Sequence, residues 1–489
     1  MTKLKLVFAA LLTLLVTVTG GKVFAEDVSY TLTLNETTTG HTYEAYQIFT
    51  GDLSGDTLSN ITWGSGVNTA GQTALGDATT QADSLDATGD DSITAQIFAQ
   101  KVSQYLGTSS ASVESTSGTT IITGLTTGYY LVKDADSSQS GENSSYTRFI
   151  LEVVKDTTAT LKADVPTVEK KVIDTNDTTG ITSDWQDSAD YDINDAVPFQ
   201  LTATLPSNYD AYAEYYLEFK DTLSAGLTFN NDAKVYLVNG ATETEITSNF
   251  TIANNGSSYK INNLKVVSGV TSSSKIVVRY TATLNSNAVI GSVGNPNTVN
   301  LVYSNNPNYT GAGENSPKGE TPKDTVIIFT YQVIVNKVDN NNVALAGAGF
   351  TLYKKDVNGA YQVVEVITAG SATTFTFRGL DDGDYKLSET TTPSGYNTMT
   401  DVEFTVTADH DILSDSPALT SLSGNVKNGD LAFTSNLEDG SLVTTVVNKK
   451  GSVLPSTGST GTRALYLVGV VLILSAAVLF VTKKRMNTK

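Results

Sequence analysis

Short stretches in which apolar and polar residues alternate recur along this chain, and they constrain its fold more than any other feature. Clear cases are Ser29–Leu34, Arg148–Val154, Lys275–Leu284 and Tyr331–Lys337, each set between turn-rich segments. Alternation with a period of two is typical of a strand that buries one face. One stretch, Ser92–Leu106, instead spaces its apolar residues as a helix does. We therefore predict an all-β protein with a short helix in its first third.

The N-terminus has the order of a secretory signal. Lys3 and Lys5 precede the apolar stretch Leu6–Val18, and Val23-Phe24-Ala25 offers small residues at both key positions before a cleavage point after Ala25. Such a segment is removed on export and takes no part in the fold. We expect residues 1–25 to be a signal peptide, so that the mature chain is exported.

The C-terminus has the order of a membrane anchor. Ala464–Thr482 contains no charged residue, and its 19 residues are long enough to cross a hydrocarbon core of about 30 Å. The basic residues Lys483, Lys484 and Arg485 follow at once. Because basic clusters stay on the cytoplasmic side, everything before this helix lies outside the membrane.

The exported part is long enough for about three domains. Breaks are suggested by Asp164–Thr167, by the polar stretch Asn305–Asp324 and by Lys449–Val453. We predict tandem immunoglobulin-like β-sandwich domains. Their expected bounds are 26–164, 165–330 and 331–450, followed by an anchor segment, 451–489.

Composition excludes several function classes. The chain has no cysteine and two histidines, His41 and His410, with no HExxH or CxxC pattern. A histidine- or cysteine-based metal centre or nucleophile is therefore not expected, and no cofactor is predicted. The net charge of −20 argues against nucleic-acid binding. No spacing of carboxylates singles out a catalytic pair, so a secreted enzyme is not favoured.

A pentapeptide lies just before the apolar run: Leu454, Pro455, Ser456, Thr457 and Gly458. Followed by a span and a basic tail, it resembles the sorting signal of Gram-positive surface proteins that sortases attach to the cell wall. The resemblance implies cleavage between Thr457 and Gly458, transfer of the threonine carbonyl to an amine, and loss of the membrane helix. It places the mature protein on the cell surface, attached to peptidoglycan.

Three polar residues fall in line with core positions of three expected strands in the last domain. They are Lys337 after Val333 and Val335, Glu389 after Tyr385 and Leu387, and Asn448 after Val446. Residues two apart on a strand share a face, so these polar groups enter one core. Burying a lone ammonium or carboxylate is costly unless it is paired.

Four segments give this domain a family resemblance: Tyr331–Asp339, Leu345–Leu352, Tyr385–Tyr396 and Thr445–Asn448. Together they resemble the collagen-adhesin B-type domain of Gram-positive surface proteins. The resemblance implies an intramolecular isopeptide bond between Lys337 and Asn448, assisted by protonated Glu389. Burial would lower the lysine pKa and raise the glutamate pKa, as that single-turnover reaction requires.

Three segments give the middle domain its own family resemblance: Val165–Val172, Tyr216–Leu227 and Gly294–Tyr303. Together they resemble the second domain of sortase-built pilus backbone subunits, which also carries an isopeptide bond. The residues implied are Lys170, Asp221 as the assisting acid, and Asn297. Each alternates with apolar residues. Lys171 and Asn300 remain rivals, because a one-residue slip of register would exchange the faces.

The first domain departs from this pattern. No lysine occurs between Lys22 and Lys101, although Gly128–Asp134 resembles the acid-bearing strand of the last domain. We predict that this domain has no internal cross-link and is the least stable of the three. At its junction with the middle domain, Lys162 resembles by position the pilin lysine that attacks the sorting threonine of another subunit. Lys155 and Lys171 are the alternatives.

These resemblances imply a backbone subunit of a sortase-assembled pilus, which polymerises head to tail with identical subunits. A pilin sortase, a housekeeping sortase and peptidoglycan are the expected partners, and accessory pilins remain open. The alternative is a monomeric wall-anchored adhesin that binds a host ligand.

Overall fold

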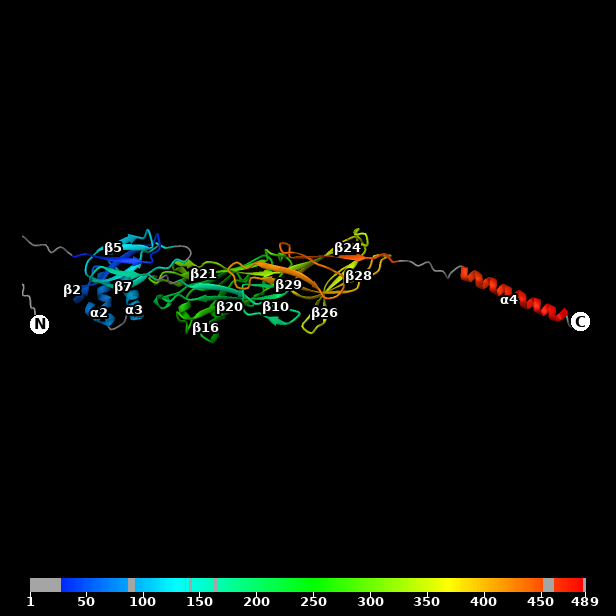
Figure 1. Cartoon of the computed structure of the whole chain (residues 1–489). Coiled ribbons are helices and arrows are strands. Elements are labelled where there is room, and N and C mark those ends of the chain that lie inside the picture. The colour runs from blue at the N-terminus through cyan, green and yellow to red at the C-terminus, as the bar shows by residue number, and fades with distance from the viewer. Residues whose placement is uncertain are drawn as a thin grey trace, which may run out of the picture.

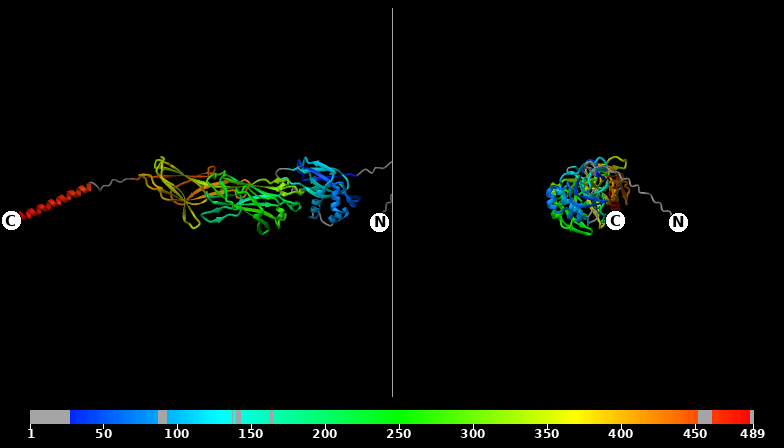
Figure 2. Two further views of the ribbon diagram at one scale, coloured as in Figure 1. Left: turned by 180° about the vertical axis from the view of Figure 1, so that it is seen from behind. Right: turned by 90° about the vertical axis from the view of Figure 1, so that its left-hand side faces the viewer.

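The computed structural model describes residues 28–86, 93–136, 138–139, 143–161, 165–451 and 461–486. The expected signal peptide, Lys162 and the LPSTG motif, residues 454–458, lie outside these ranges. Within them the chain is built mainly of strands, and this confirms the predicted all-β fold. Three sandwich-like units follow one another in a row (Figures 1 and 2), so the molecule is elongated along its chain order.

The first domain has three layers. Its strands form one sheet in the order β5-β1-β8 and another in the order β3-β2-β6-β7, with β4 beside β2. The elements are β1 Tyr30–Asn35, β2 Thr42–Ser54, β3 Thr57–Trp63, α1 Thr69–Leu75, α2 Ala78–Asp86, α3 Ile93–Val102, the 3₁₀ turn Ser103–Tyr105, β4 Ala111–Glu114, β5 Thr119–Leu125, β6 Gly128–Asp134, β7 Arg148–Val153 and β8 Thr157–Thr160.

The helices of this domain cover the second sheet. Tyr130 and Val132 of β6 pack against the first sheet, whereas Leu131 packs with Phe98 and Val102 of α3. β6 is therefore buried on both faces. The predicted helix Ser92–Leu106 is confirmed as α3 and its 3₁₀ turn, but α1 and α2 were not expected, because they are short and rich in threonine.

The middle domain is a sandwich of two larger sheets. Their orders are β12-β23-β21-β14-β19-β18, with β22 beside β21, and β17-β16-β20-β13-β9, with β15 beside β20. The strands are β9 Thr167–Val172, β10 Thr175–Asn176, β11 Ile181–Thr182, β12 Ser188–Asp190, β13 Ala196–Thr204, β14 Leu217–Leu223, β15 Leu227–Phe229, β16 Lys234–Asn239, β17 Thr242–Glu245, β18 Thr251–Ile252, β19 Ser258–Ile261, β20 Lys275–Leu284, β21 Asn295–Ser304, β22 Lys318–Glu320 and β23 Asp324–Phe329. Four 3₁₀ turns join them: Tyr209–Ala211, Thr247–Asn249, Leu264–Val266 and Gly313–Asn315.

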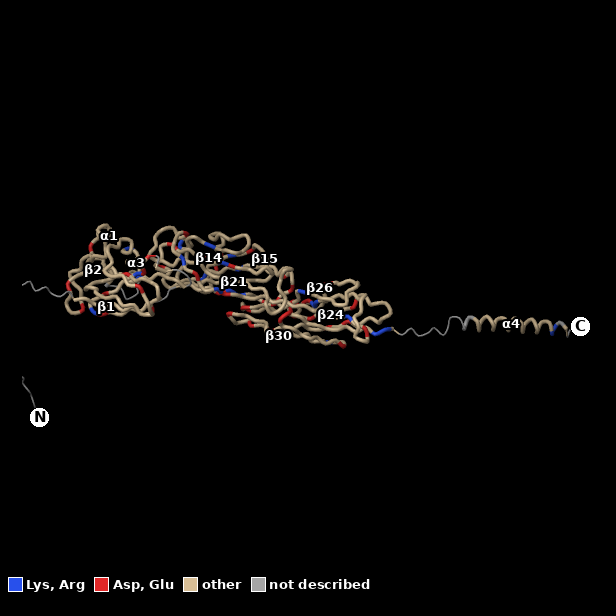
Figure 3. Tube along the Cα trace, turned by 90° about the horizontal axis from the view of Figure 1, so that it is seen from above, with Lys and Arg blue, Asp and Glu red and all other residues tan. Residues whose placement is uncertain are grey.

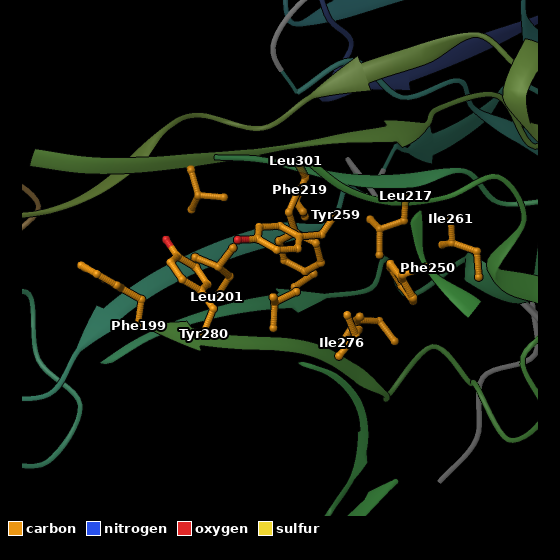
Figure 4. Close-up of a cluster of buried hydrophobic side chains, with 14 of the residues drawn as sticks. Phe199, Leu201, Leu217, Phe219, Phe250, Tyr259, Ile261, Ile276, Tyr280 and Leu301 are labelled. Carbon is orange, nitrogen blue, oxygen red and sulfur yellow. The ribbon is translucent and has the colours of Figure 1, made fainter. Parts of the chain in front are cut away.

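Alternation explains how this core closes. On β20, Ile276, Val278 and Tyr280 point into the sandwich and meet residues such as Phe219 and Leu301 from the opposite sheet. Figure 4 shows these side chains between the two layers. The predicted strand Lys275–Leu284 coincides with β20.

The third domain is a smaller sandwich. Its sheets have the orders β27-β24-β32-β31 and β26-β25-β28-β29-β30. The first strand, β24, and the last long strand, β32, run parallel and side by side. The strands are β24 Tyr331–Asp339, β25 Gly349–Lys355, β26 Tyr361–Ile367, β27 Thr374–Leu380, β28 Gly383–Thr391, β29 Val402–His410, β30 Leu419–Val426, β31 Thr434–Asn436 and β32 Ser441–Asn448.

The polar stretch Asn305–Asp324 does not separate two domains, as its composition suggested. It carries β22 back onto β21 and leads into β23 of the same sheet. It also packs on the first domain, where the Tyr146 amide donates to the Asn305 carbonyl at 2.7 Å. The Arg148 guanidinium donates to the Pro307 carbonyl at 2.9 Å. The middle domain instead passes into the third between β23 and β24.

After the third domain comes one long helix, α4 Gly461–Met486. Within it, Ala464–Lys484 has 21 residues and a mean hydropathy of 2.8, so in the described part of the chain it is the one helix long and apolar enough to cross a membrane. It agrees with the predicted anchor.

Candidate isopeptide and anchoring sites

Three polar residues from different strands meet in the core of the middle domain. Lys170 lies on β9, in one sheet, and Asn297 lies on β21, in the other. Asp221 lies on β14, beside β21, where it is opposite Val299. Lys170 and Asn297 are 0% exposed and Asp221 is 3% exposed. The lysine side chain therefore crosses the sandwich from one sheet to the other.

The polar atoms of this site form a closed set of hydrogen bonds. The Lys170 Nζ donates to Asn297 Oδ1 at 2.5 Å and also to the Asp221 carboxylate. A fourth residue, Tyr280 on β20, donates its hydroxyl to Asp221 Oδ2 at 2.5 Å. Asn297 Nδ2 in turn donates to the Tyr280 oxygen at 2.7 Å. The amine is thus held beside the side-chain amide that it would attack.

The surroundings favour the uncharged amine. Burial lowers the pKa of Lys170 to about 8, although the nearby charge of Asp221 opposes the shift. The rings of Phe199 and Tyr280 lie 5.6 and 5.8 Å from the Lys170 Nζ, and both rings are visible in the core in Figure 4. Burial and the Asp221 charge raise the pKa of Tyr280 well above its ordinary value, so its hydroxyl remains a donor.

This arrangement supplies the parts of an amide exchange. A neutral Lys170 amine can attack the Asn297 carbonyl carbon, and the new N–C bond forms as the amide nitrogen leaves as ammonia. A protonated Asp221 would polarise the carbonyl oxygen and transfer a proton to the departing nitrogen. Tyr280 would orient both Asp221 and the amide.

The rival residues face the other way. Lys171 pairs with Asp187 at 2.5 Å and with Glu169 at 3.4 Å, and Asn300 donates to Glu320 at 3.3 Å. Of the two candidate pairs, the register therefore brings Lys170 and Asn297 together in the core.

Tyr280 was not singled out from the sequence. Its signal was present, because Ile276, Val278, Tyr280 and Ala282 alternate along one strand. A phenol in line with three apolar core positions is a buried polar group that needs a partner.

The corresponding residues of the third domain share a core but are less tightly joined. Lys337 is 0% exposed and Asn448 is 1% exposed. On the parallel strands β24 and β32, Lys337 is opposite Val446, so Asn448 lies two residues further on the same face. Asn448 Nδ2 donates to Glu389 Oε1 at 2.6 Å, and Glu389 Oε2 accepts the Met399 amide at 2.8 Å.

The lysine of this site is held by backbone carbonyls. Lys337 Nζ donates to the carbonyls of Val338 at 3.1 Å and Val446 at 3.3 Å. Burial lowers the pKa of Lys337, with Glu389 opposing the shift. Asn448 Oδ1 is buried and has no hydrogen-bond partner among the described residues. Movement of the amine onto Asn448 Oδ1 would give that oxygen the lysine donor that Asn297 Oδ1 has in the middle domain.

The two candidate pairs join strands at different places in the order of their domains. In the third domain the pair joins the first strand to the last long strand, β24 to β32. In the middle domain it joins the first strand, β9, to β21, while the last strand is β23. Only the third-domain pair therefore joins the first strand of its domain to the last.

In the first domain, the acid-bearing strand β6 has an acid, Asp134, with no lysine partner among the described residues. Asp134 is fully buried, and its Oδ1 lies 3.4 Å from Nδ1 of His41. Lys133 points elsewhere and pairs with Asp136 at 3.0 Å. Lys155, one alternative to Lys162 at the domain junction, is 65% exposed and pairs with Asp56 at 2.6 Å.

Known families and relatives match parts of this chain. A family model described as a prealbumin-like fold domain matches residues 331–416, and one described as an LPXTG cell wall anchor motif matches residues 446–488. The trypsin-resistant surface T6 protein of Streptococcus pyogenes serotype M6 is 26% identical over 388 residues, covering 67% of this chain and 70% of the relative.

Solved structures of pilins are similar to this chain. The T6 backbone pilin of serotype M6 Streptococcus pyogenes, described as a modular three-domain structure, is 20% identical with a TM-score of 0.56. That match covers 88% of this chain and 100% of the other. The full-length major pilin SpaD from Corynebacterium diphtheriae is 18% identical with a TM-score of 0.47, covering 88% and 99%. The chain is therefore similar to LPXTG-anchored backbone pilins of Gram-positive bacteria, and it shares the three-domain fold of the T6 backbone pilin.

Proposed function

We propose that this chain is the repeating structural subunit of a covalent pilus. A pilin sortase cleaves after Thr457, and a lysine of the next subunit, Lys162, takes over the threonine carbonyl. Because the contact is head to tail, the product is an open filament and not a closed ring. A housekeeping sortase then attaches the finished polymer to peptidoglycan. The protein is a building block, and its own bond-forming chemistry occurs once in each subunit.

The observation that carries this proposal is the position of the lysine-amide pairs along the path of tension. In such a polymer a pulling force enters at residue 162 and leaves at residue 457. It therefore runs through the middle and third domains, and both contain a buried lysine close to an asparagine. The first domain precedes residue 162 and carries no load, and its opening strand, β1, has no lysine.

A bond between Lys170 and Asn297, and another between Lys337 and Asn448, would shorten the loaded path. Force would pass from β9 directly to β21, then along the chain to β24, and from there to β32. The residues between each bonded pair would carry no tension. The chain contains no cysteine and so can form no disulfide. A shaft built with these two bonds would resist extension without disulfides.

Polymerisation can be tested on cells. Wild type should give a ladder of high-mass species after wall digestion and denaturing electrophoresis, and Lys162→Ala should give the monomer alone. The matched control is Lys155→Ala, which removes an exposed lysine near the same junction. Lys171→Ala tests the other alternative.

The outcomes separate the candidate functions. A ladder that persists in Lys162→Ala would exclude that lysine. Wild-type protein that reaches the wall but never forms a ladder would favour the monomeric adhesin instead. Thr457→Ala should abolish both the ladder and wall attachment.

A further inference from the structure

Lys170 of the middle domain is held at both of its ends. Its side-chain amine donates to Asp221 and to Asn297. Its main-chain amide donates to a second carboxylate, Oδ2 of Asp324, at 2.6 Å. The lysine therefore lies between two carboxylates, and only Asp221 belongs to the set of reacting groups described so far.

The main-chain contact is made at the edge of a sheet. β9 ends the order β17-β16-β20-β13-β9, so β13 pairs with one side of it. On the other side, the Val172 amide donates to the Gln186 carbonyl at 2.8 Å. Amides two residues apart on a strand point the same way, so the Lys170 amide points to this open side as well. Asp324 accepts it there, and an amide of a buried residue does not remain without an acceptor.

Asp324 comes from the opposite sheet, where it shares a row with Asp221. In the antiparallel pairing of β23 with β21, Asp324 is opposite Val299. In the pairing of β14 with β21, Asp221 is opposite the same Val299. Figure 3 labels β14 and β21, which lie side by side in the middle domain. Because residues opposite one another on neighbouring strands share a face, both carboxylates point toward β9.

The amide that Lys170 would attack lies in the next row of this face. Asn297 precedes Val299 by two residues on β21 and is opposite Val326 of β23. One sheet thus carries both the carboxylate that holds the Lys170 main chain and the amide that faces its side chain. Fixing the main chain against Asp324 therefore fixes where the lysine side chain begins relative to the Asn297 carbonyl.

We propose that Asp324 is a positioning residue for the bond between Lys170 and Asn297, because it holds β9 where the amine reaches the amide carbon. This inference rests on the proposed isopeptide bond and adds a residue to it. Asp324 contacts main-chain amides, those of Lys170 and Thr325, and it takes no part in the proton transfers as ammonia leaves. A displacement of about 1 Å between reacting groups can slow a reaction about 100-fold, so such a contact affects the rate strongly.

The same carboxylate also acts on the amine through its charge. Burial lowers the pKa of Lys170, and the charges of Asp221 and Asp324 both oppose this shift. Removing the charge of Asp324 should therefore let Lys170 lose its proton at a lower pH. The other titratable and charged groups around Lys170 and Asp324 are Tyr280, Lys171 and Asp187.

The test follows bond formation in the exported chain, residues 26–451, which contains all three domains. The chain is taken unfolded from inclusion bodies, refolded by rapid dilution at a series of pH values, and stopped with acidic denaturant at timed intervals. Proteolysis and mass spectrometry then give the fraction of chains in which the peptide containing Lys170 is joined to the peptide containing Asn297.

Two substitutions of Asp324 separate its contact from its charge. Asp324→Ala removes the acceptor and should slow bond formation about 10- to 100-fold at the optimum pH. Asp324→Asn keeps an oxygen that accepts the Lys170 amide, so at its optimum it should react at nearly the wild-type rate. Because it lacks the charge, the lower-pH limb of its rate profile should move to lower pH. A contribution to stability alone would leave this limb in place.

The matched control is Glu214→Ala, which removes a carboxylate that accepts the Gly313 amide in the same domain, three residues before β14 begins. It should form the bond at the wild-type rate. If Asp324→Ala reacts as fast as wild type, or Glu214→Ala is slowed equally, Asp324 is not a positioning residue. An Asp324→Asn chain that is as slow as Asp324→Ala, or whose pH limb does not move, would also refute the inference. If Asp324→Ala fails to fold, the Asp324→Asn profile decides alone.

Failure of the underlying bond gives a different result. Wild-type chains that fold but never yield the joined peptide would refute the isopeptide bond of the middle domain, and the role of Asp324 with it. Joined peptide in wild type, formed at the same rate in Asp324→Ala, would leave the bond established and refute the role of Asp324 alone.

Discussion

Replacing Asn297 with alanine should change how the shaft extends under force. The substitution removes the carbonyl that Lys170 would attack, so no covalent bond joins residues 170 and 297. A pulling force must then pass through the whole chain segment between these two residues. That segment spans 127 positions in sequence. Because an extended chain reaches at most about 3.3–3.6 Å per residue, the variant should release about 430 Å of additional length when the domain unfolds.

The same bond should also stabilise the domain without force. Closing a loop of this size in the unfolded chain contributes about 5 kcal/mol in the chain-entropy model. For a domain of this size, such a loss lowers the unfolding midpoint by about 10–20 °C. Asn297→Ala also leaves the buried Lys170 amine without the amide oxygen that accepts its hydrogen bond. Lys170→Met breaks the same bond and also removes the amine that donates to the buried Asp221 carboxylate, so it should be at least as destabilising as Asn297→Ala.

Single-molecule pulling would measure the released length directly. The chain contains no cysteine, so Lys162→Cys and Thr457→Cys provide unique handles at the two ends of the proposed force path. Intact mass provides the chemical check, since each bond loses one ammonia, about 17 Da. The wild-type exported chain should be about 34 Da lighter than its sequence, and Asn297→Ala about 17 Da lighter.

Asn300→Ala is the matched control, because it lies on the same strand and faces Glu320 on the other side. It should keep the full mass deficit and release no additional length. A wild-type chain with no deficit, or one that already extends by the full segment, would refute the reasoning. So would an Asn297→Ala chain that extends no further than Asn300→Ala.

Four further outcomes are expected. Glu389→Gln should leave the third domain unlinked, and intact mass should then show a deficit of about 17 Da instead of about 34 Da. Tyr280→Phe should slow bond formation in the middle domain, visible as a mixture of linked and unlinked masses in freshly folded protein, because Asp221 loses its hydroxyl donor. The first domain should be the first cleaved when the exported chain is warmed with trypsin, and a first cleavage in the third domain would contradict this. Thermal unfolding should show the contact between the middle and third domains losing stability as pH rises from about 4 to 8. Burial raises the pKa of Asp174 to about 7 and that of Asp382 to about 6. In the folded state these carboxyl groups therefore bind protons that the unfolded chain releases near pH 4.

Much of the candidate chemistry could be predicted from the sequence because strands alternate strictly. A lysine two residues from a core valine must enter the same core, and this rule alone assigns Lys337 and Asn448 to the interior. The same rule left Lys170 and Lys171 open, since a slip of one residue exchanges them. The pairing of β9 with β13, in which Lys170 is opposite Leu201, brings Lys170 to the inner face.

Other features could not be predicted because they depend on which strands become neighbours. Tyr280 lies 59 positions from the Asp221 that it contacts, and nothing local in the sequence links them. The polar stretch after β21 has the composition of a linker, yet it folds back onto its own sheet and onto the first domain. Asp190 of the middle domain likewise lies close to Asp381 and Asp382 of the third domain, although they are far apart in the chain.

Periodicity and local composition, which are written along the chain, were enough to predict the strand-rich fold, the order of the domains, the exported and anchored state, and the residue types that enter each core. Three sets of contacts required the folded molecule: Lys170 with Asn297, Tyr280 with both Asp221 and Asn297, and Asp190 with Asp381 and Asp382. These contacts arise when two sheets, or two domains, pack face to face. Such packing is fixed by shape and burial over the whole core, and no short segment of the chain encodes it.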